Sequence, residues 1–248
     1  MFTSKGRPTA LDFEPYFRLM SAYESDDAPP GIPLQALVEE LRSRCEAAAR
    51  LQGGSTHYLE EVRIFRAYAA ERGLYLHRPP AALSRSPDDE GNEHQVWFLS
   101  DTASFLKVTW PDFFGLLVLY RLDEEERASP IAYLERWHLH NELFGDSVRL
   151  LGVLEEGDRL RLVIEQPAIE GKPATLEQIN EFFTSNGWRR FTTNNEVAYF
   201  DPEFQVVISD THQGNLILMD DGLLAPIDLR VQLVSGALLD YVIKACRD

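Results

Sequence analysis

Three oxygen-bearing side chains, those of Asp210, Asn215 and Asp228, interrupt an otherwise apolar stretch near the end of the 248-residue chain. Asp210 directly follows the run QVVIS, which is typical of a buried strand, and a strand end holds a catalytic group firmly. Asn215 and Asp228 stand on either side of Asp221–Gly222, a dipeptide that favours a tight turn. We expect this turn to make a hairpin whose open end carries Asn215 and Asp228.

The chemistry of this trio points to a hard cation. Carboxylate and amide oxygens suit Mg²⁺, which keeps several waters and takes further ligands from substrate phosphates. The alternative is that Asp210 is only a turn residue with local hydrogen bonds. The combined spacing of the three residues favours a magnesium site.

Other chemistries find little support in the sequence. It has no GxxxxGK[ST] phosphate loop, no GxSxG, no HExxH and no GxGxxG. His138 and His140 are two residues apart in a predicted helix, so they point in different directions and are not expected to share a metal.

Composition limits the partners of the chain. Hydrophobic residues make up 44% and the net charge is −16, so a real core is expected, whereas binding to nucleic acid or to an anionic membrane is not. Cys45 and Cys246 show no disulfide or zinc spacing. Because the chain shows neither the apolar run of a signal peptide nor a stretch approaching ~20 apolar residues, we predict a cytoplasmic protein without a membrane span.

The elements that must position the trio follow from periodicity and turn residues. Helices are predicted over 34–51, 57–73, 129–145, 175–183 and 235–246, and strands over 95–99, 104–110, 148–155, 159–166, 203–209, 215–219 and 223–228. Residues 84–94 are polar and predict a loop. Strands and helices come in groups rather than in βαβ alternation, which predicts an α+β fold.

The motifs, in their order and spacing, resemble the polyvalent protein kinases, a bacterial and phage group within the protein kinase and aminoglycoside phosphotransferase superfamily. The resemblance covers about residues 84–230 and rests on FLKVTWPDFFG, YLERWHLHNELFGD, EQPAIEG and SDTHQGN…PIDLR. It implies a minimal two-lobed kinase-like fold over 81–248, with an upper lobe at 81–168 and a reduced lower lobe at 169–248. Residues 1–80 would be an N-terminal extension, largely helical from about 35.

The resemblance also implies roles for residues of this chain. Asp210 matches the catalytic Asp that orients the acceptor hydroxyl and accepts its proton, and Asn215 and Asp228 match the metal ligands. Lys107 matches the strand lysine that neutralises the ATP phosphates, and Glu135 the helix glutamate that pairs with it, with Glu142 as second candidate. The hinge that receives adenine through backbone groups matches Glu165, Gln166 and Pro167.

The implied activity is transfer of phosphate from ATP with Mg²⁺, and we expect a protein Ser/Thr hydroxyl as acceptor. Two features of the sequence, the segment 84–95 and the form of the loop at Asp210, keep alternatives open. The segment 84–95 stands where a glycine-rich phosphate-covering loop belongs, yet it holds only Gly91, and Glu93 and His94 are candidates there without a defined role. This favours a non-catalytic nucleotide-binding module, whereas the form SDTHQGN favours a small-molecule phosphotransferase. Nucleotidyl transfer onto protein is a further alternative.

Overall fold

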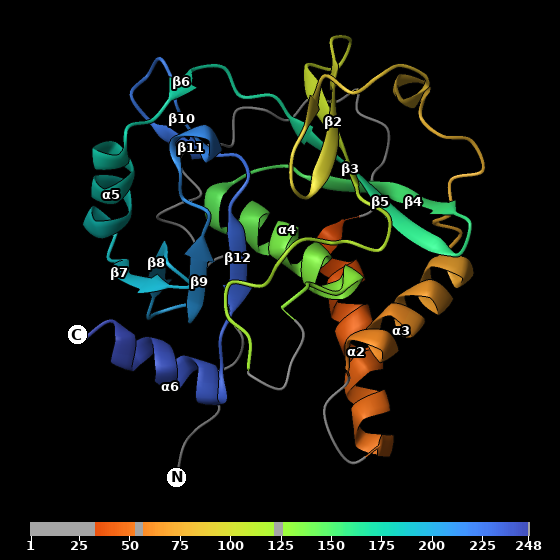
Figure 1. Cartoon of the computed structure of the whole chain (residues 1–248), viewed down its shortest axis with the longest axis horizontal. Helices are drawn as coiled ribbons and strands as arrows, with labels where there is room; N and C mark the ends of the chain where they lie inside the picture. Colours follow the sequence, from red (N-terminus) through yellow and green to blue (C-terminus); the bar gives the residue numbers. More distant parts are fainter. Residues whose placement is uncertain (1–32, 53–56, 122–125, 248) are drawn as a thin grey trace. The chain divides into compact units, whose positions relative to one another are not determined.

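The computed structural model describes residues 33–52, 57–121 and 126–247 (Figure 1). The chain divides into two compact units. The first unit takes its described residues from Asp26–His138 and Ser147–Ala168, and the second from Leu139–Asp146 and Ile169–Asp248. Most of the predicted extension belongs to the first unit, while its residues 1–32 lie outside the described part. No described helix is long and apolar enough to cross a membrane.

The first unit contains a five-stranded antiparallel sheet in the order β1-β2-β3-β5-β4. Its strands are β1 (Asp89–Glu90), β2 (His94–Leu99), β3 (Ser104–Thr109), β4 (Arg149–Glu156) and β5 (Arg159–Pro167). The predicted strand pairs 95–99 with 104–110 and 148–155 with 159–166 are confirmed. The polar segment 84–94, predicted as a loop, instead includes β1, which pairs with β2 through Asp89↔Val96 and Glu90↔Gln95.

Three helices of the first unit surround its larger core. These are α2 (Leu34–Gln52), α3 (Tyr58–Glu71) and the first part of α4 (Pro130–Phe144), and all three were predicted. Ser129 caps α4, since its hydroxyl accepts a hydrogen bond from the amide of Ala132 at 3.1 Å. Pro130 suits the first helical position. The core side chains include Leu41 of α2, Phe65 of α3 and Trp137 of α4, each with no exposed surface.

The two faces of this sheet carry different side chains. Leu106 and Val108 of β3 join Trp97 and Val163 in a smaller core on one face. Lys107 alternates with them and therefore points to the other face, where its register partner Ile164 packs in the same core as α4. The sequence thus turns Lys107 toward α4, and only 6% of it is exposed.

The described residues of the second unit form two small antiparallel sheets, two helices of their own and the end of α4. The sheet orders are β11-β10-β6 and β12-β9-β8-β7. The elements are β6 (Lys172–Pro173), α5 (Leu176–Ser185), β7 (Arg189–Thr193), β8 (Glu196–Asp201), β9 (Val206–Ser209), β10 (Leu216–Leu218), β11 (Leu224–Pro226), β12 (Arg230–Leu233) and α6 (Gly236–Ala245). The predicted capping box of α5 is present, because Thr175 and Gln178 each accept a hydrogen bond from the other's backbone amide.

The core of the second unit joins α5 to the strands that carry the candidate site. Phe183 of α5 stacks on Tyr199 of β8 at 4.6 Å between ring centroids, and both pack with Ile208 of β9. Burying each of these side chains contributes roughly 1.5–3 kcal/mol. The strand that ends at Asp210 is therefore held by a packed core along its length.

Candidate active site

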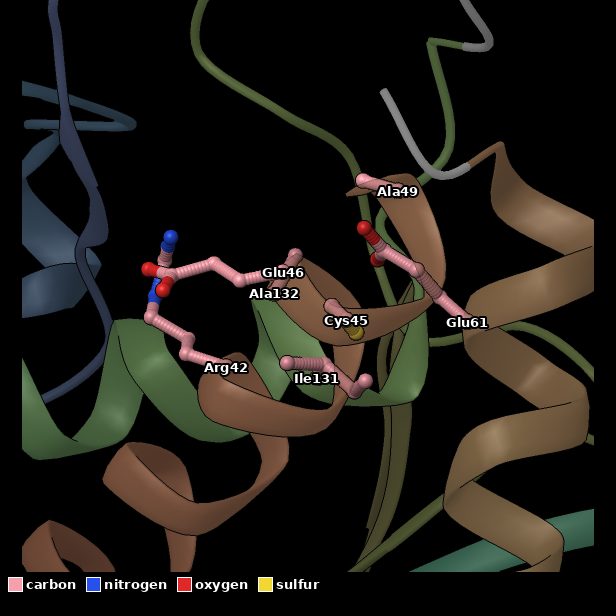
Figure 2. Close-up of a pocket in the computed structure, with 7 residues that line it drawn as sticks. All are labelled: Arg42, Cys45, Glu46, Ala49, Glu61, Ile131 and Ala132. Atoms are coloured by element: carbon pink, nitrogen blue, oxygen red, sulfur yellow. The ribbon is translucent and has the colours of Figure 1, made fainter. Parts of the chain in front are cut away.

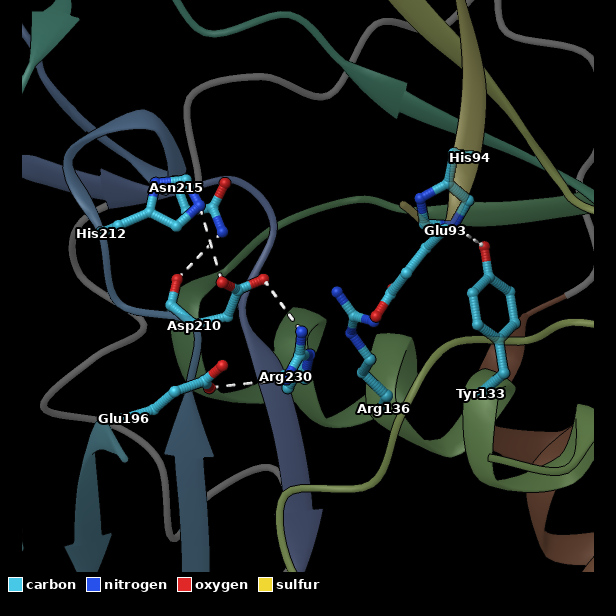
Figure 3. A network of polar contacts seen from close by, with 9 residues as sticks. All are labelled: Glu93, His94, Tyr133, Arg136, Glu196, Asp210, His212, Asn215 and Arg230. Atoms are coloured by element: carbon cyan, nitrogen blue, oxygen red, sulfur yellow. Dashed lines mark hydrogen bonds and ion pairs between the residues drawn. The ribbon is translucent and has the colours of Figure 1, made fainter. Parts of the chain in front are cut away.

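Asp210 lies where β9 ends, as predicted, and its backbone is held in an unusual conformation. Its φ of 63° lies in the left-handed region, which a short polar residue tolerates better than most others. Its carbonyl accepts two hydrogen bonds, from the amide of His212 at 3.0 Å and from Nδ2 of Asn215 at 2.9 Å. The loop therefore fixes the backbone from which the Asp210 carboxylate projects (Figure 3).

His212 supports the same loop through both ring nitrogens. Its Nδ1 accepts the amide of Gly214 at 3.0 Å, so Nε2 carries the proton in the neutral ring. That Nε2 lies 3.5 Å from Oδ1 of Asp210. The ring is well exposed, so His212 steadies the carboxylate only weakly.

Arg230 is a site residue that sequence reasoning missed. It begins β12, whose register places Arg230 opposite Ser209, the residue before Asp210. Its guanidinium lies 3.9 Å from Oδ2 of Asp210 and 3.5 Å from Glu196. The contact could not be read from IDLR, because it depends on β12 pairing with β9.

Asn215 and Asp228 come from the predicted hairpin, which the structure contains. Strands β10 and β11 pair through Leu216↔Pro226, and the amide of Ile227 donates to the carbonyl of Asn215 at 2.9 Å. This bond joins Asn215 to the residue directly before Asp228. Because Nδ2 of Asn215 donates to Asp210, its Oδ1 is left to act as an acceptor or ligand.

This donor set fits Mg²⁺ but does not form a complete cage. Among the described residues no group of three or more His, Cys, Asp or Glu side chains is arranged to hold a metal. Asn215 and Asp228 offer two hard oxygen ligands, and Mg²⁺ commonly binds through one or two protein groups while water and phosphate supply the rest. The residues present therefore suit an ion that arrives with a nucleotide.

The first unit holds the residues predicted to contact the nucleotide. Nζ of Lys107 lies 4.9 Å from the centre of the Trp137 ring on α4. Glu135, two residues before Trp137, points in another direction along the helix and bonds Arg42 of α2. Pairing of Glu135 with Lys107 stays a prediction.

Glu142, the second candidate partner, lies in the part of α4 that belongs to the second unit. Burial raises the pKa of its carboxyl. A neighbouring lysine would lower that pKa instead. The direction of the shift therefore does not indicate a lysine beside Glu142.

The predicted hinge is the end of β5. Glu165 is buried, and its carboxylate accepts bonds from Ser104 at 2.6 Å and from Arg149 at 2.7 Å. Gln166 and Pro167 pair with β3. The pairing of β5 with β4 extends only as far as Arg149↔Glu165 and does not include them. The Glu165 side chain is thus structural, and only backbone groups of this segment suit the predicted adenine contact.

A cavity of about 270 Å³ lies within the first unit, and Figure 2 shows its lining side chains. They come from α2, α3 and α4 and are Arg42, Cys45, Glu46, Ala49, Glu61, Ile131 and Ala132. Glu61 accepts a hydrogen bond from Ser129, and Arg42 bonds Glu135. These two charged groups join helices to one another, and we assign the lining a structural role.

Comparison with known proteins identifies the class of the chain and then its family. A family model of kinases matches residues 59–235, well over half of the chain, so the protein carries a kinase domain. The chain belongs to the family described as "Serine/Threonine/Tyrosine Kinase found in polyvalent proteins", which confirms the resemblance of its motifs. Neither the curated proteins nor the solved structures gave a match.

Proposed function

We propose that this chain transfers the γ-phosphoryl group of ATP, in the presence of Mg²⁺, to a hydroxyl of an acceptor protein. The proposal includes the two-lobed kinase arrangement that the family resemblance implies. The observation that carries it is the loop after β9, where Asn215 bonds the Asp210 carbonyl and the amide of Ile227, the residue before Asp228, bonds the Asn215 carbonyl. One short segment thereby supplies a candidate base and two candidate metal ligands.

The chemistry asked of the protein is mainly positioning and charge neutralisation. The acceptor oxygen forms a bond to the γ phosphorus, the bond to the β–γ bridging oxygen breaks, and ADP leaves. Asp210 orients the acceptor hydroxyl and takes its proton. Asn215 and Asp228 would hold Mg²⁺, which supplies positive charge to the phosphates when it is bound.

Lys107 would neutralise the nucleotide phosphates from the first unit. Its place on the inward face of β3, buried beside the Trp137 ring of α4, supports this role. Glu135 would support Lys107 in this proposal, and the backbone of Glu165, Gln166 and Pro167 would receive the adenine.

The proposal is tested by incubating the pure protein with Mg²⁺ and either γ-labelled or α-labelled ATP, with and without lysate proteins. Label transferred from the γ position alone is the expected result. Label from the α position would mean nucleotidyl transfer instead. Absence of transfer from either, with nucleotide still bound, would mean a non-catalytic module. Label that appears in small molecules and not in protein would identify a small-molecule phosphotransferase, the candidate that the form SDTHQGN favours.

A further inference from the structure

The turn at residues 91–94, in the place of the phosphate-covering loop, is held by hydrogen bonds within the first unit. Its turn closes through a bond from the Gly91 amide to the His94 carbonyl at 2.8 Å. Trp110 clamps the turn from the side, since its indole donates to the Gly91 carbonyl at 3.0 Å and its amide to the Glu93 carbonyl at 3.3 Å. A loop with one glycine is thus held in one shape by hydrogen bonds.

Two polar contacts then fasten this turn to α4. Glu93 forms an ion pair with Arg136, and the two side chains are only 11% and 6% exposed. The next residue, His94, lies 2.8 Å from the hydroxyl of Tyr133 through its Nε2, and both are buried. Tyr133 and Arg136 are three residues apart and share one face of α4 (Figure 3).

Gly115 makes room for the Glu93 carboxylate. A Cβ atom at Gly115 would lie 2.8 Å from each of the three carboxylate atoms of Glu93, and its φ of +85° also disfavours a side chain. Gly115 ends the WPDFFG stretch that begins at Trp110. This stretch therefore contacts the turn at both ends, once through Trp110 and once through Gly115.

Arg136, which pairs with Glu93, lies near Lys107, the lysine predicted to contact phosphate. The Arg136 guanidinium lies 5.1 Å and the Lys107 ammonium 4.9 Å from the centre of the same Trp137 ring. Two cations beside one buried ring would repel each other. Glu93 neutralises Arg136, and its own negative charge is turned inward instead of facing a phosphate.

We propose that Glu93 and Arg136 are positioning residues for the nucleotide: their buried pair fixes the glycine-poor turn 91–94, in the place of the phosphate-covering loop, against α4. This inference rests on the proposed function, because it names how that same site holds ATP. Neither residue is expected to contact the reacting atoms. Their effect is on the affinity for Mg·ATP rather than on the rate of transfer.

The test compares Glu93→Gln, Arg136→Lys and the control Arg44→Gln, which removes an ion pair with Glu40 and Glu71 elsewhere in the first unit. We expect Glu93→Gln to weaken Mg·ATP affinity about tenfold with turnover at saturating ATP within about threefold. Arg136→Lys keeps the positive charge and should retain affinity within about threefold of the wild type. Arg44→Gln should leave affinity unchanged.

Amide hydrogen exchange gives a second readout that does not depend on activity. Glu93→Gln should speed exchange at residues 91–95, and Arg44→Gln should not. If Glu93→Gln does not fold, Glu93→Asp withdraws the carboxylate by one methylene, and the expected loss of affinity is about threefold.

The two hypotheses fail in different ways. A wild-type protein that binds no Mg·ATP contradicts the proposed function. A wild type that binds, together with a Glu93→Gln variant of equal affinity or unchanged exchange at 91–95, contradicts only the positioning role. Equal losses of affinity and turnover in all variants would also overturn it, because that result means general destabilisation.

Discussion

At the scale of single residues, the site depends on how each carboxylate is placed and paired. Asp210 has a fixed backbone, and its carboxylate has two weakly interacting neighbours, the His212 ring and the Arg230 guanidinium. Glu93 is buried with Arg136, whereas Glu142 is partly buried and its pKa is raised by that burial. A carboxyl group is thus a candidate base in Asp210, half of a buried ion pair in Glu93 and a source of destabilisation in Glu142, depending on its surroundings.

Asp228→Ala tests the metal assignment. We expect Mg²⁺ to stop strengthening nucleotide binding in this variant, with a loss of Mg·ATP affinity of at least about tenfold, since even changes around metal ligands cost roughly 10–100-fold. Calorimetric titration with a non-hydrolysable ATP analogue, with and without Mg²⁺, measures this. Asp220→Ala, at an exposed position of the same hairpin, is the control and should bind normally. Unchanged Mg²⁺ dependence in Asp228→Ala would remove Asp228 from the metal site.

Glu142→Gln tests the consequence of burial. The folded protein raises the Glu142 pKa above its ordinary 4.5, so the charged form destabilises the fold, and this loss grows as pH rises through the range above 4.5. We expect the variant to melt at a higher temperature than the wild type at pH 7, and the difference to disappear near pH 4. Thermal melts at both pH values measure it, with exposed Glu181→Gln as control. A lower melting temperature at pH 7 would indicate instead that a cation stabilises Glu142.

At the scale of elements, the helices before residue 80 are part of the first unit's core rather than an appendage to it. Leu41 of α2 and Phe65 of α3 pack in the same cluster as Trp137 of α4. Polar contacts add to this packing: Arg42 bonds Glu135, and Ser129 joins Glu61 to the start of α4. The helices α2 and α3 therefore help to set the position of α4.

A double-mutant cycle on Arg42→Gln and Glu135→Gln measures the link between α2 and α4. Glu135 is largely buried, so we expect a coupling of about 1–2 kcal/mol in the free energy of unfolding. Arg44 and Glu71, a more exposed pair from α2 to α3, should couple by about 0.2–1 kcal/mol. Strong coupling of Glu135 with Lys107, and none with Arg42, would support the family role of Glu135 and contradict the link.

Most elements could be predicted from the sequence, and the missed ones have physical reasons. Long periodic helices and the hairpin at Asp221–Gly222 carry strong local signals. The β7–β8 hairpin was missed although Asn194–Asn195 adopts positive φ at its turn, a signal that Asn-Asn offers. Strands β1 and β6 have two residues each and exist only through pairing, which no local pattern encodes.

The candidate site was predictable to a similar extent. Asp210, Asn215 and Asp228 could be found because spacing and a turn relate them. Arg230, Arg42 and Arg136 could not, because their contacts join segments that are far apart in sequence or set by strand register. The inward direction of the Lys107 side chain could be determined only from the structure, in which β3 lies between β2 and β5.

At the scale of the whole molecule, the net charge of −16 bears on the acceptor of the proposed transfer. We expect such a charge to disfavour nucleic acid and to favour encounter with neutral or basic acceptors. The proposed binding of ATP is compatible with this charge, because the nucleotide would bring Mg²⁺ with it. The family assignment and the loop after β9 together support the proposed phosphoryl transfer.

The most direct test of that claim compares single-turnover transfer and nucleotide affinity in the wild type and in Asp210→Asn. Asparagine tolerates the left-handed backbone found at this position, so the loop should keep its shape while the base is lost. We predict that transfer from γ-labelled ATP falls ~10²–10⁴-fold while affinity for Mg·ATP is nearly unchanged, as expected for an interaction made mainly in the transition state. Transfer by the Asn variant at the wild-type rate would mean that Asp210 is only a loop residue and takes no part in the transfer.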